Sequence, residues 1–155
     1  MMNLKNTSEL LITLLSQANK KSEKKVYNCF IRTLTSLKNK DLSENQSQLI
    51  QEKLSSLNLK TTTENRKKYY QQKLSEFKSF LKNEFSFTSE KYYTELGIAF
   101  GLSFGTGIGL AIGTAINPIT GTSIGLSIGI GVGMLIGMMY GARKDAEAKR
   151  QGRVI

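Results

Sequence analysis

The chain has 155 residues with 22 Lys and Arg, 12 Asp and Glu, no His and one Cys, and its formal charge is +10. This composition excludes metal sites built on His or Cys clusters, and it leaves a Ser or Cys nucleophile without its usual base. We therefore expect no enzyme activity, no catalytic residue and no bound cofactor or metal. Every charged side chain lies outside residues 96–142, and this uncharged span of 47 residues holds 13 of the 14 glycines. Such a span is too long for one element of a soluble core and long enough for two membrane crossings.

Residues 1–87 predict a small antiparallel bundle of four helices. Asn6 and Glu9 have the spacing of a capping box, which predicts a first helix that continues to about Asn19. A second helix is predicted from about Ser22 until the polar run at 39–41. The apolar residues of these two helices recur at helical spacing: Leu10, Leu11, Leu14 and Leu15 in the first, then Val26, Tyr27, Phe30, Ile31, Leu34 and Leu37 in the second.

Two further helices complete the predicted bundle. Ser43 and Gln46 offer a cap for the third helix, and the run Thr61-Thr62-Thr63-Glu64 begins the fourth. Their apolar residues are Leu49, Ile50, Leu54 and Leu57, then Tyr70, Leu74, Phe77 and Leu81 with Phe80 and Phe85 alongside. No Gly or Pro interrupts these segments, which favours four continuous helices, and we expect the bundle to lie in the cytosol.

Three basic clusters lie on the predicted bundle, at 20–21, 24–25 and 66–68. Solvated helix faces explain them most simply, and anionic lipid is a better charged partner than nucleic acid because an apolar span follows directly. The aromatic residues lie on the apolar stripes rather than between the cations, which disfavours base stacking. A regulatory protein that binds the bundle is a further candidate partner.

Residues 88–142 predict a transmembrane hairpin of two helices. The uncharged runs 96–116 and 119–142 are each about as long as a bilayer core is thick, and Asn117-Pro118 forms the turn. Positive charges flank the hairpin but not its turn, which places both termini in the cytoplasm of a bacterial cell. Residues 143–155 form a short basic tail, in which Arg143, Lys144, Lys149 and Arg150 are expected to contact lipid headgroups.

The glycines of this hairpin recur at every fourth residue, which places them on one face of each helix and lets two backbones approach closely. The predicted helix-packing positions are Gly97, Gly101, Gly105, Gly109 and Gly113, then Gly121, Gly125, Gly129, Gly133, Gly137 and Gly141. The spacing fits neither a dinucleotide fingerprint nor a phosphate loop.

A second small face lies almost opposite the first on residues 96–116, because two residues advance a helix by about 200°. It comprises Ala99, Ser103, Gly107, Ala111 and Ala115. The second span repeats it in part, with Ser123, Ser127 and Gly131. A hairpin needs only one small face per helix, so two faces predict a homo-oligomer in which each helix packs on both sides.

A β-hairpin is the alternative for this segment, because small and large residues also alternate with a period of two. Three observations oppose it. Each run is about twice as long as a membrane strand needs to be, glycine weakens strands, and the small face lacks the polar residues of a watery lumen.

The runs of glycine at 97–113 and 121–141 resemble the glycine-zipper membrane proteins, a group of small bacterial proteins with tandem glycine-spaced spans. The group includes envelope lipoproteins and also toxins or effectors that permeabilise membranes. The resemblance implies that the glycines at four-residue spacing are interface positions. The chain lacks the signal segment and lipidated Cys of the envelope lipoproteins, so we expect a location in the cytoplasmic membrane.

Two functions follow from this organisation. The first is an oligomeric membrane protein that permeabilises or depolarises a membrane through its hairpins, as a toxin or defence effector does. The second is a non-conducting scaffold or partner subunit that uses the zipper only for helix–helix assembly. Liposome leakage separates the two.

Overall fold

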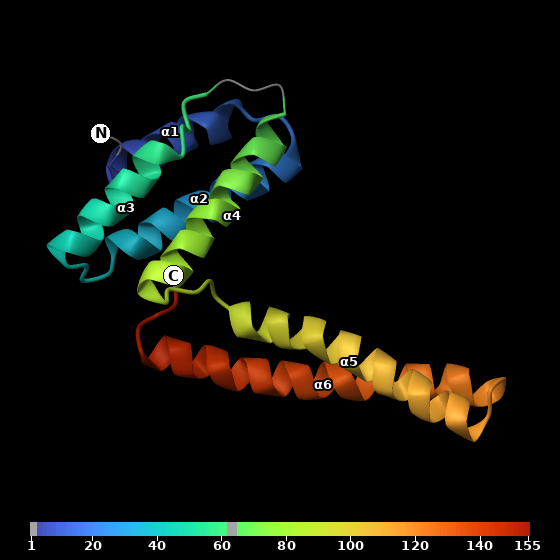
Figure 1. Ribbon diagram of the computed structural model, residues 1–155. Coiled ribbons are helices and arrows are strands. Elements are labelled where there is room, and N and C mark those ends of the chain that lie inside the picture. The colour runs from blue at the N-terminus through green and yellow to red at the C-terminus, as the bar shows by residue number, and fades with distance from the viewer. Residues whose placement is uncertain (1–2, 62–64) are drawn as a thin grey trace. The chain divides into compact units, whose positions relative to one another are not determined.

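The computed structural model describes residues 3–61 and 65–155, and all regular structure in these residues is helical (Figure 1). The helices are α1 (Leu4–Gln17), α2 (Lys21–Lys38), α3 (Glu44–Ser56), α4 (Arg66–Phe85), α5 (Tyr92–Ile116) and α6 (Thr120–Arg150). They form two compact units, Met1–Thr88 with Ile155 and Ser89–Val154. The predicted all-α fold class is confirmed, and the β-hairpin alternative is wrong.

Helix α1 begins one turn earlier than its sequence predicts. Asn3 is the capping residue, and its side-chain oxygen accepts from the Asn6 backbone N–H at 2.8 Å. The predicted cap at Asn6 with Glu9 is therefore wrong, because Asn6 lies inside the first turn. Both asparagines suit the role, and the earlier start adds Leu4 to the residues that pack against the core.

The other helix starts follow local capping chemistry. The capping box of Ser43 and Gln46 is present at α3, as its sequence predicts. The Asn65 side chain accepts from the Lys68 N–H and caps α4. Positions 62–64 of the predicted start at Thr61–Glu64 lie outside the described residues. Helix α4 ends at Phe85, and the left-handed conformation of the following Ser86 (φ 56°) turns the chain out of the helix.

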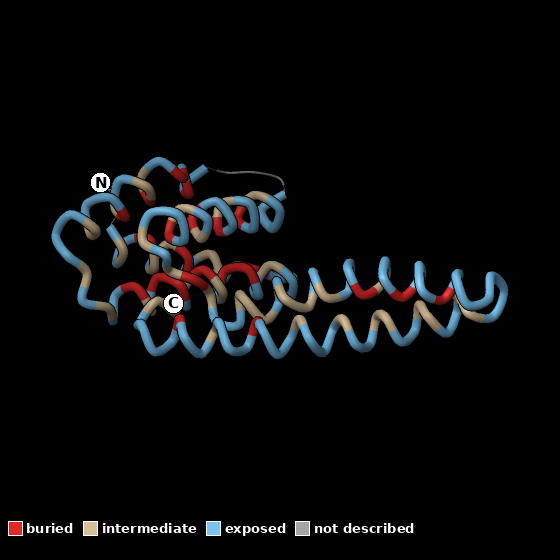
Figure 2. The backbone as a smooth tube through the Cα atoms, turned by 60° about the horizontal axis from the view of Figure 1, so that its bottom comes forward, coloured by how far each residue is buried: buried red, intermediate tan, exposed pale blue. Residues whose placement is uncertain are grey.

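The first unit is the predicted bundle, in which α2 packs against both α1 and α4, and α3 contacts α1 and α4. Its core contains Leu11, Val26, Tyr27, Phe30, Leu34, Leu37, Ile50, Leu54, Leu57, Leu59, Tyr70, Leu74, Phe77 and Leu81. Figure 2 shows these buried positions on the inner sides of the helices. Nearly all of them lie on the predicted stripes. Leu49 differs from its prediction because 37% of its surface remains exposed, while Leu59 joins the core from the loop after α3.

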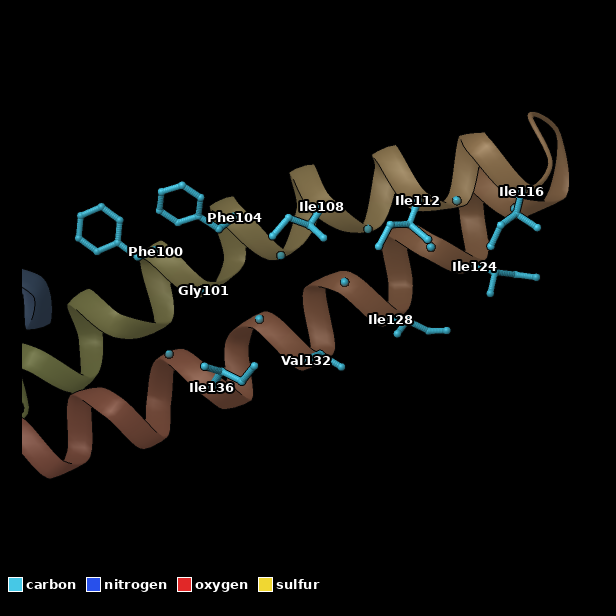
Figure 3. A pocket seen from close by; sticks show the side chains of 18 of the residues that line it. Phe100, Gly101, Phe104, Ile108, Ile112, Ile116, Ile124, Ile128, Val132 and Ile136 are labelled. Atoms are coloured by element: carbon cyan, nitrogen blue, oxygen red, sulfur yellow. The ribbon is translucent and has the colours of Figure 1, made fainter.

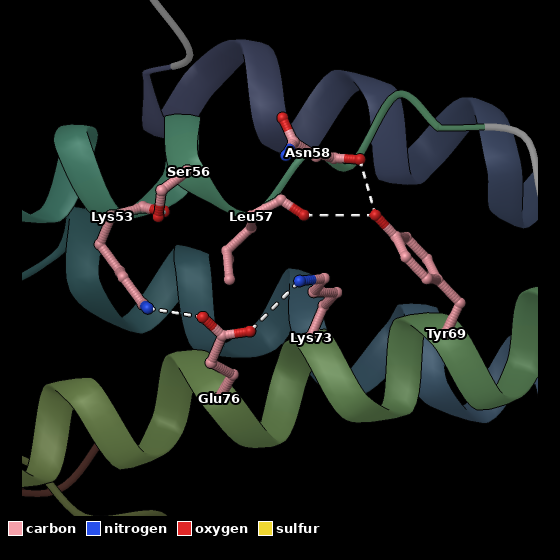
Figure 4. Close-up of polar contacts among 7 residues, drawn as sticks. All are labelled: Lys53, Ser56, Leu57, Asn58, Tyr69, Lys73 and Glu76. Atoms are coloured by element: carbon pink, nitrogen blue, oxygen red, sulfur yellow. Dashed lines mark hydrogen bonds and ion pairs between the residues drawn. The ribbon is translucent and has the colours of Figure 1, made fainter.

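Polar contacts connect α4 to α3 and to the loop that follows α3 (Figure 4). Glu76 accepts from Lys53 at 2.6 Å and from Lys73 at 3.3 Å. The Tyr69 hydroxyl donates to the Asn58 carbonyl at 2.8 Å. Beside it, the buried Tyr70 hydroxyl donates to the Leu59 carbonyl. These tyrosine bonds satisfy carbonyls of a turn in which Asn58 has positive φ, so they hold the connection between the two helices.

The second unit consists of α5 and α6, which pack side by side in antiparallel directions. Helix α5 begins at Tyr92, four residues before the uncharged run, and α6 continues through the basic residues to Arg150. Most of the predicted tail is therefore the last part of α6. By length and composition, both helices are long and apolar enough to cross a membrane.

Candidate functional site

The glycines of α5 face the glycines of α6 at five successive levels. The facing pairs are Gly97 with Gly137, Gly101 with Gly133, Gly105 with Gly129, Gly109 with Gly125, and Gly113 with Gly121. Gly141 faces the backbone of Tyr93 and Thr94 at a sixth level. The two glycines of every pair are equally far from Asn117 in the sequence, so the turn sets the register. We name these eleven glycines the glycine ladder, and they are the predicted helix-packing positions.

No side-chain atom fits between the two helices at the ladder. A Cβ built on Gly109 would lie 2.8 Å from the Gly129 Cα, and one on Gly125 would lie 2.7 Å from the Gly113 Cα. At every ladder position the nearest atom to that Cβ is a backbone carbonyl oxygen across the interface, closer still. A glycine Cα–H therefore points at a carbonyl at each level, the arrangement of Cα–H···O contacts between closely packed helices. Figure 2 shows the buried positions of α5 on the side that faces α6.

Asn117 ends α5, and its side chain bonds to the backbone at the start of α6. Its N–H donates to the Gly113 carbonyl at 3.1 Å. Its side-chain oxygen accepts from the Ile119 N–H at 2.9 Å and from the Thr120 N–H at 3.1 Å. The turn thus satisfies backbone groups that the helix ends would leave unpaired.

The base of the hairpin has a cap that comes from the other helix. Lys91, the residue before α5, makes no capping bond with its side chain. Instead the Asp145 carboxylate of α6 accepts from the Tyr93 N–H at 3.0 Å, the Thr94 N–H at 2.9 Å and the Thr94 hydroxyl at 2.6 Å. A carboxylate at a helix N-terminus also complements the helix dipole. Sequence reasoning missed this role, although Asp145 lies one turn beyond Gly141, the last rung of the ladder.

Five hydroxyl groups along the hairpin bond to a carbonyl one turn earlier in the chain. In each case the acceptor is the carbonyl four residues earlier, and the donors are Ser103, Thr106, Thr114, Thr122 and Ser127. The distances lie between 2.6 and 3.0 Å. These side chains therefore need no water for hydrogen bonding.

The predicted second small face is exposed along its whole length. It comprises Ala99, Ser103, Gly107, Ala111 and Ala115 on α5, and Ser123, Ser127 and Gly131 continue the pattern on α6. A Cβ built on Gly107 or Gly131 meets no atom within 4 Å. The ladder glycines are thus used inside the hairpin, whereas this second face lies along its two outer edges.

One broad face of the hairpin carries an apolar groove of about 890 Å³ (Figure 3). All ladder glycines except Gly141 form its floor. Its walls are Phe100, Phe104, Ile108, Ile112 and Ile116 on α5, and Ile124, Ile128, Val132, Ile136 and Tyr140 on α6. At least half of the surface of each wall residue is exposed. The α6 side chains on the opposite broad face are less exposed, since Leu126 and Ile130 are partly buried and Met134 and Met138 are each 37% exposed.

The predicted headgroup contacts Arg143, Lys144, Lys149 and Arg150 are all exposed on the last turns of α6. Lys144 also forms an ion pair with Glu147 at 3.3 Å, between two exposed side chains. In the part of the chain that the structure describes, no three acidic or Cys side chains gather where they could hold a metal ion.

No family model matches the chain, no curated protein is similar to it in sequence, and no solved structure matches its fold.

Proposed function

We propose that the chain is an oligomeric protein of the bacterial cytoplasmic membrane, with both termini in the cytoplasm, whose glycine-zipper hairpins permeabilise or depolarise a membrane as a toxin or defence effector does. The observation that carries this proposal is the distribution of polar and apolar groups across the hairpin. Its interior consists of backbone and glycine, whereas its outer surface is apolar and free of charge over residues 96–142. Exposed side chains include Phe104 (68%), Ile116 (78%) and Ile119 (85%). A surface of this kind is typical of contact with lipid.

The open second small face supports oligomer formation. The ladder glycines already pack against each other within one hairpin, so contacts between copies need other small residues. Gly107 and Gly131 are open and can make such contacts without a change in the hairpin. At equal distances from Asn117, Gly107 lies level with Ser127, and Ser103 lies level with Gly131. Copies side by side in the same orientation would bring small residues of α5 against small residues of α6.

The chemistry of the hairpin favours a pore with weak ion selectivity. Both broad faces are apolar, and five hydroxyls are bonded to their own backbone, so neither face offers a ring of charges or free carbonyls. A lumen of such side chains opens and closes by wetting and dewetting.

The direct test is ion conductance in a planar bilayer and dye release from liposomes. Gly107→Leu with Gly131→Leu should leave each hairpin folded but block contact between copies, so leakage and the oligomer are lost together. Leu110→Ile is the matched control, because it changes another exposed residue of α5 that lies outside the groove and adds no bulk to an outer edge. Inserted, oligomeric wild-type protein that releases no dye would contradict the pore and favour the non-conducting scaffold.

A further inference from the structure

We infer that the groove on the open face of the hairpin binds an acyl chain of an anionic phospholipid, whose phosphate lies against Arg143 and Lys144. This inference rests on the proposed membrane location. It goes beyond that proposal because it selects one face of the hairpin, one end of the groove and one class of lipid.

The lining of the groove is suited to a hydrocarbon chain. Its walls are Ile, Val and Phe side chains, with Tyr140 at the base end and Asn117 and Thr120 at the turn end. Its volume of about 890 Å³ lies within the range of roughly 300–1,000 Å³ that is typical of small-molecule pockets.

The shape of the groove favours an acyl chain over a helix of another copy. Helices associate in lipid through small residues, yet this face has large side chains on both walls, and their exposed fractions reach 68% at Phe104. A helix is about 10–12 Å wide with its side chains, and the large exposed side chains on both walls oppose the close backbone approach that small residues allow. A chain one methylene wide can lie on the floor and contact both walls, which restores the dispersion contacts that an empty groove lacks.

Charge is present at only one end of the groove. The α6 wall recurs at every fourth residue from Ile124 to Tyr140, and the next position in that series is Lys144, with Arg143 beside it. The turn end has no Lys or Arg. Half of a bilayer core is about 15 Å, or about ten helical residues, so a lipid with its phosphate at Lys144 has its chain beside Ile136 and Val132.

The acidic groups near this end do not cancel the cations. Asp145 is engaged by the start of α5, and Glu95 lies in line with Ala99 on the outer edge rather than in the groove. Glu147 pairs with Lys144, but both side chains are about half exposed, at 46% and 51%, and such a surface pair is weak.

Fluorescence quenching by brominated lipids tests the inference, and the absence of Trp from the chain makes a single introduced Trp an unambiguous probe. Ile136→Trp places the probe at the charged end of the groove, and Ile124→Trp places it at the turn end of the same wall. Vesicles combine phosphatidylglycerol and phosphatidylcholine, with bromine on the acyl chains of one component at a time. Flotation with carbonate-washed vesicles reports insertion independently.

We expect brominated phosphatidylglycerol to quench the Trp of Ile136→Trp preferentially, with a local enrichment of about five-fold for each cation. Arg143→Gln with Lys144→Gln should abolish this preference, whereas Lys149→Gln with Arg150→Gln should retain it. The Trp of Ile124→Trp should be quenched equally by both lipids.

Three outcomes would overturn the inference. Equal quenching of Ile136→Trp by the two lipids means that the groove does not select a headgroup. No quenching of either Trp in protein that floats with vesicles means that protein, such as a second copy, covers the groove. Protein that does not float at all refutes the proposed membrane location, and the inference with it.

Discussion

The Asp145 carboxylate of α6 caps the first turn of α5 by accepting from both the backbone N–H and the hydroxyl of Thr94, at 2.9 and 2.6 Å. The hairpin is therefore closed at both ends by side chains that satisfy helix termini, Asn117 at the turn and Asp145 at the base. Asp145 is the first acidic residue after the uncharged span, and its charge serves a contact within the hairpin.

Replacing Asp145 by Asn should weaken the base of the hairpin while its turn remains intact. Asn is close in shape but lacks the charge and can accept through only one oxygen, so we expect a loss of about 1–2 kcal/mol. Amide hydrogen exchange in detergent micelles should show faster exchange at Tyr93 and Thr94 and unchanged protection near Gly113. Glu147→Gln, two residues further along α6, is the control and should change hydrogen exchange in neither region. Equal protection of Thr94 in wild type and variant would refute the cap.

A methyl group added to a ladder glycine should lower the stability of the hairpin, whereas one added on the outer edge should raise it. In Gly109→Ala the new Cβ meets the Gly125 carbonyl, so the helices must separate and the hairpin loses stability. In Gly107→Ala the Cβ enters open space, and the helix gains up to about 1 kcal/mol of propensity. Spin-label distances across α5 and α6, together with thermal unfolding in micelles, should distinguish the two variants. Identical behaviour would contradict the packed ladder.

The bundle should lose stability in alkali because of its buried tyrosines. Burial first, and then the hydrogen bond from its hydroxyl to Glu23 (2.8 Å), raise the pKa of Tyr27 above its ordinary value. Burial also raises the pKa of Tyr70, whose ring meets Tyr27 edge-on. A raised folded pKa means that this stability is fully present below about pH 10, the ordinary tyrosine value, and is lost as the pH rises further. Urea unfolding at increasing pH should show the loss, and Tyr27→Phe should reduce its slope.

Glu76 should make the stability of the bundle depend on pH in the acid range, by a smaller amount than the tyrosines do in alkali. The hydrogen bond from Lys53, opposed in part by burial and reinforced by Lys73, holds the pKa of Glu76 below its ordinary value. A lowered folded pKa means that the contribution is present above about pH 4.3 and is lost as the pH falls through the folded value. The side chains are partly exposed, so Glu76→Gln should cost less than about 1 kcal/mol at neutral pH. A stability difference that persists unchanged at low pH would contradict the assignment.

Local signals predicted the helical elements, because capping and periodicity act within a few residues. The capping box at Ser43 and the buried stripe through Phe30 and Phe77 needed no knowledge of tertiary contacts. The start of α1 differs from its prediction because Asn3 and Asn6 offer the same capping chemistry one turn apart, and the earlier start adds Leu4 to the packed residues.

The relations between helices were harder to predict from sequence. Four-residue spacing identified the glycine faces, but the level at which they meet depends on where the turn begins and ends. With Asn117 as the midpoint of the hairpin sequence, Gly141 lies opposite Tyr93. The cap by Asp145, one turn beyond Gly141, then follows from the same register. The open groove was not predictable by spacing, because both broad faces repeat by four. The two faces differ in exposure, since every groove-wall side chain is at least half exposed, whereas Met134 and Met138 on the opposite face are each 37% exposed.

The register of the ladder also limits how the hairpin can change in length. Deleting one residue from either helix would turn every glycine beyond it by about 100° and place large side chains between the backbones. Deleting four residues from each helix at the same level removes one rung and preserves all the others. The two helices can therefore shorten or lengthen only together and in steps of about 6 Å. The length of the hairpin would then change during evolution by four residues in each helix at a time, and not by single residues.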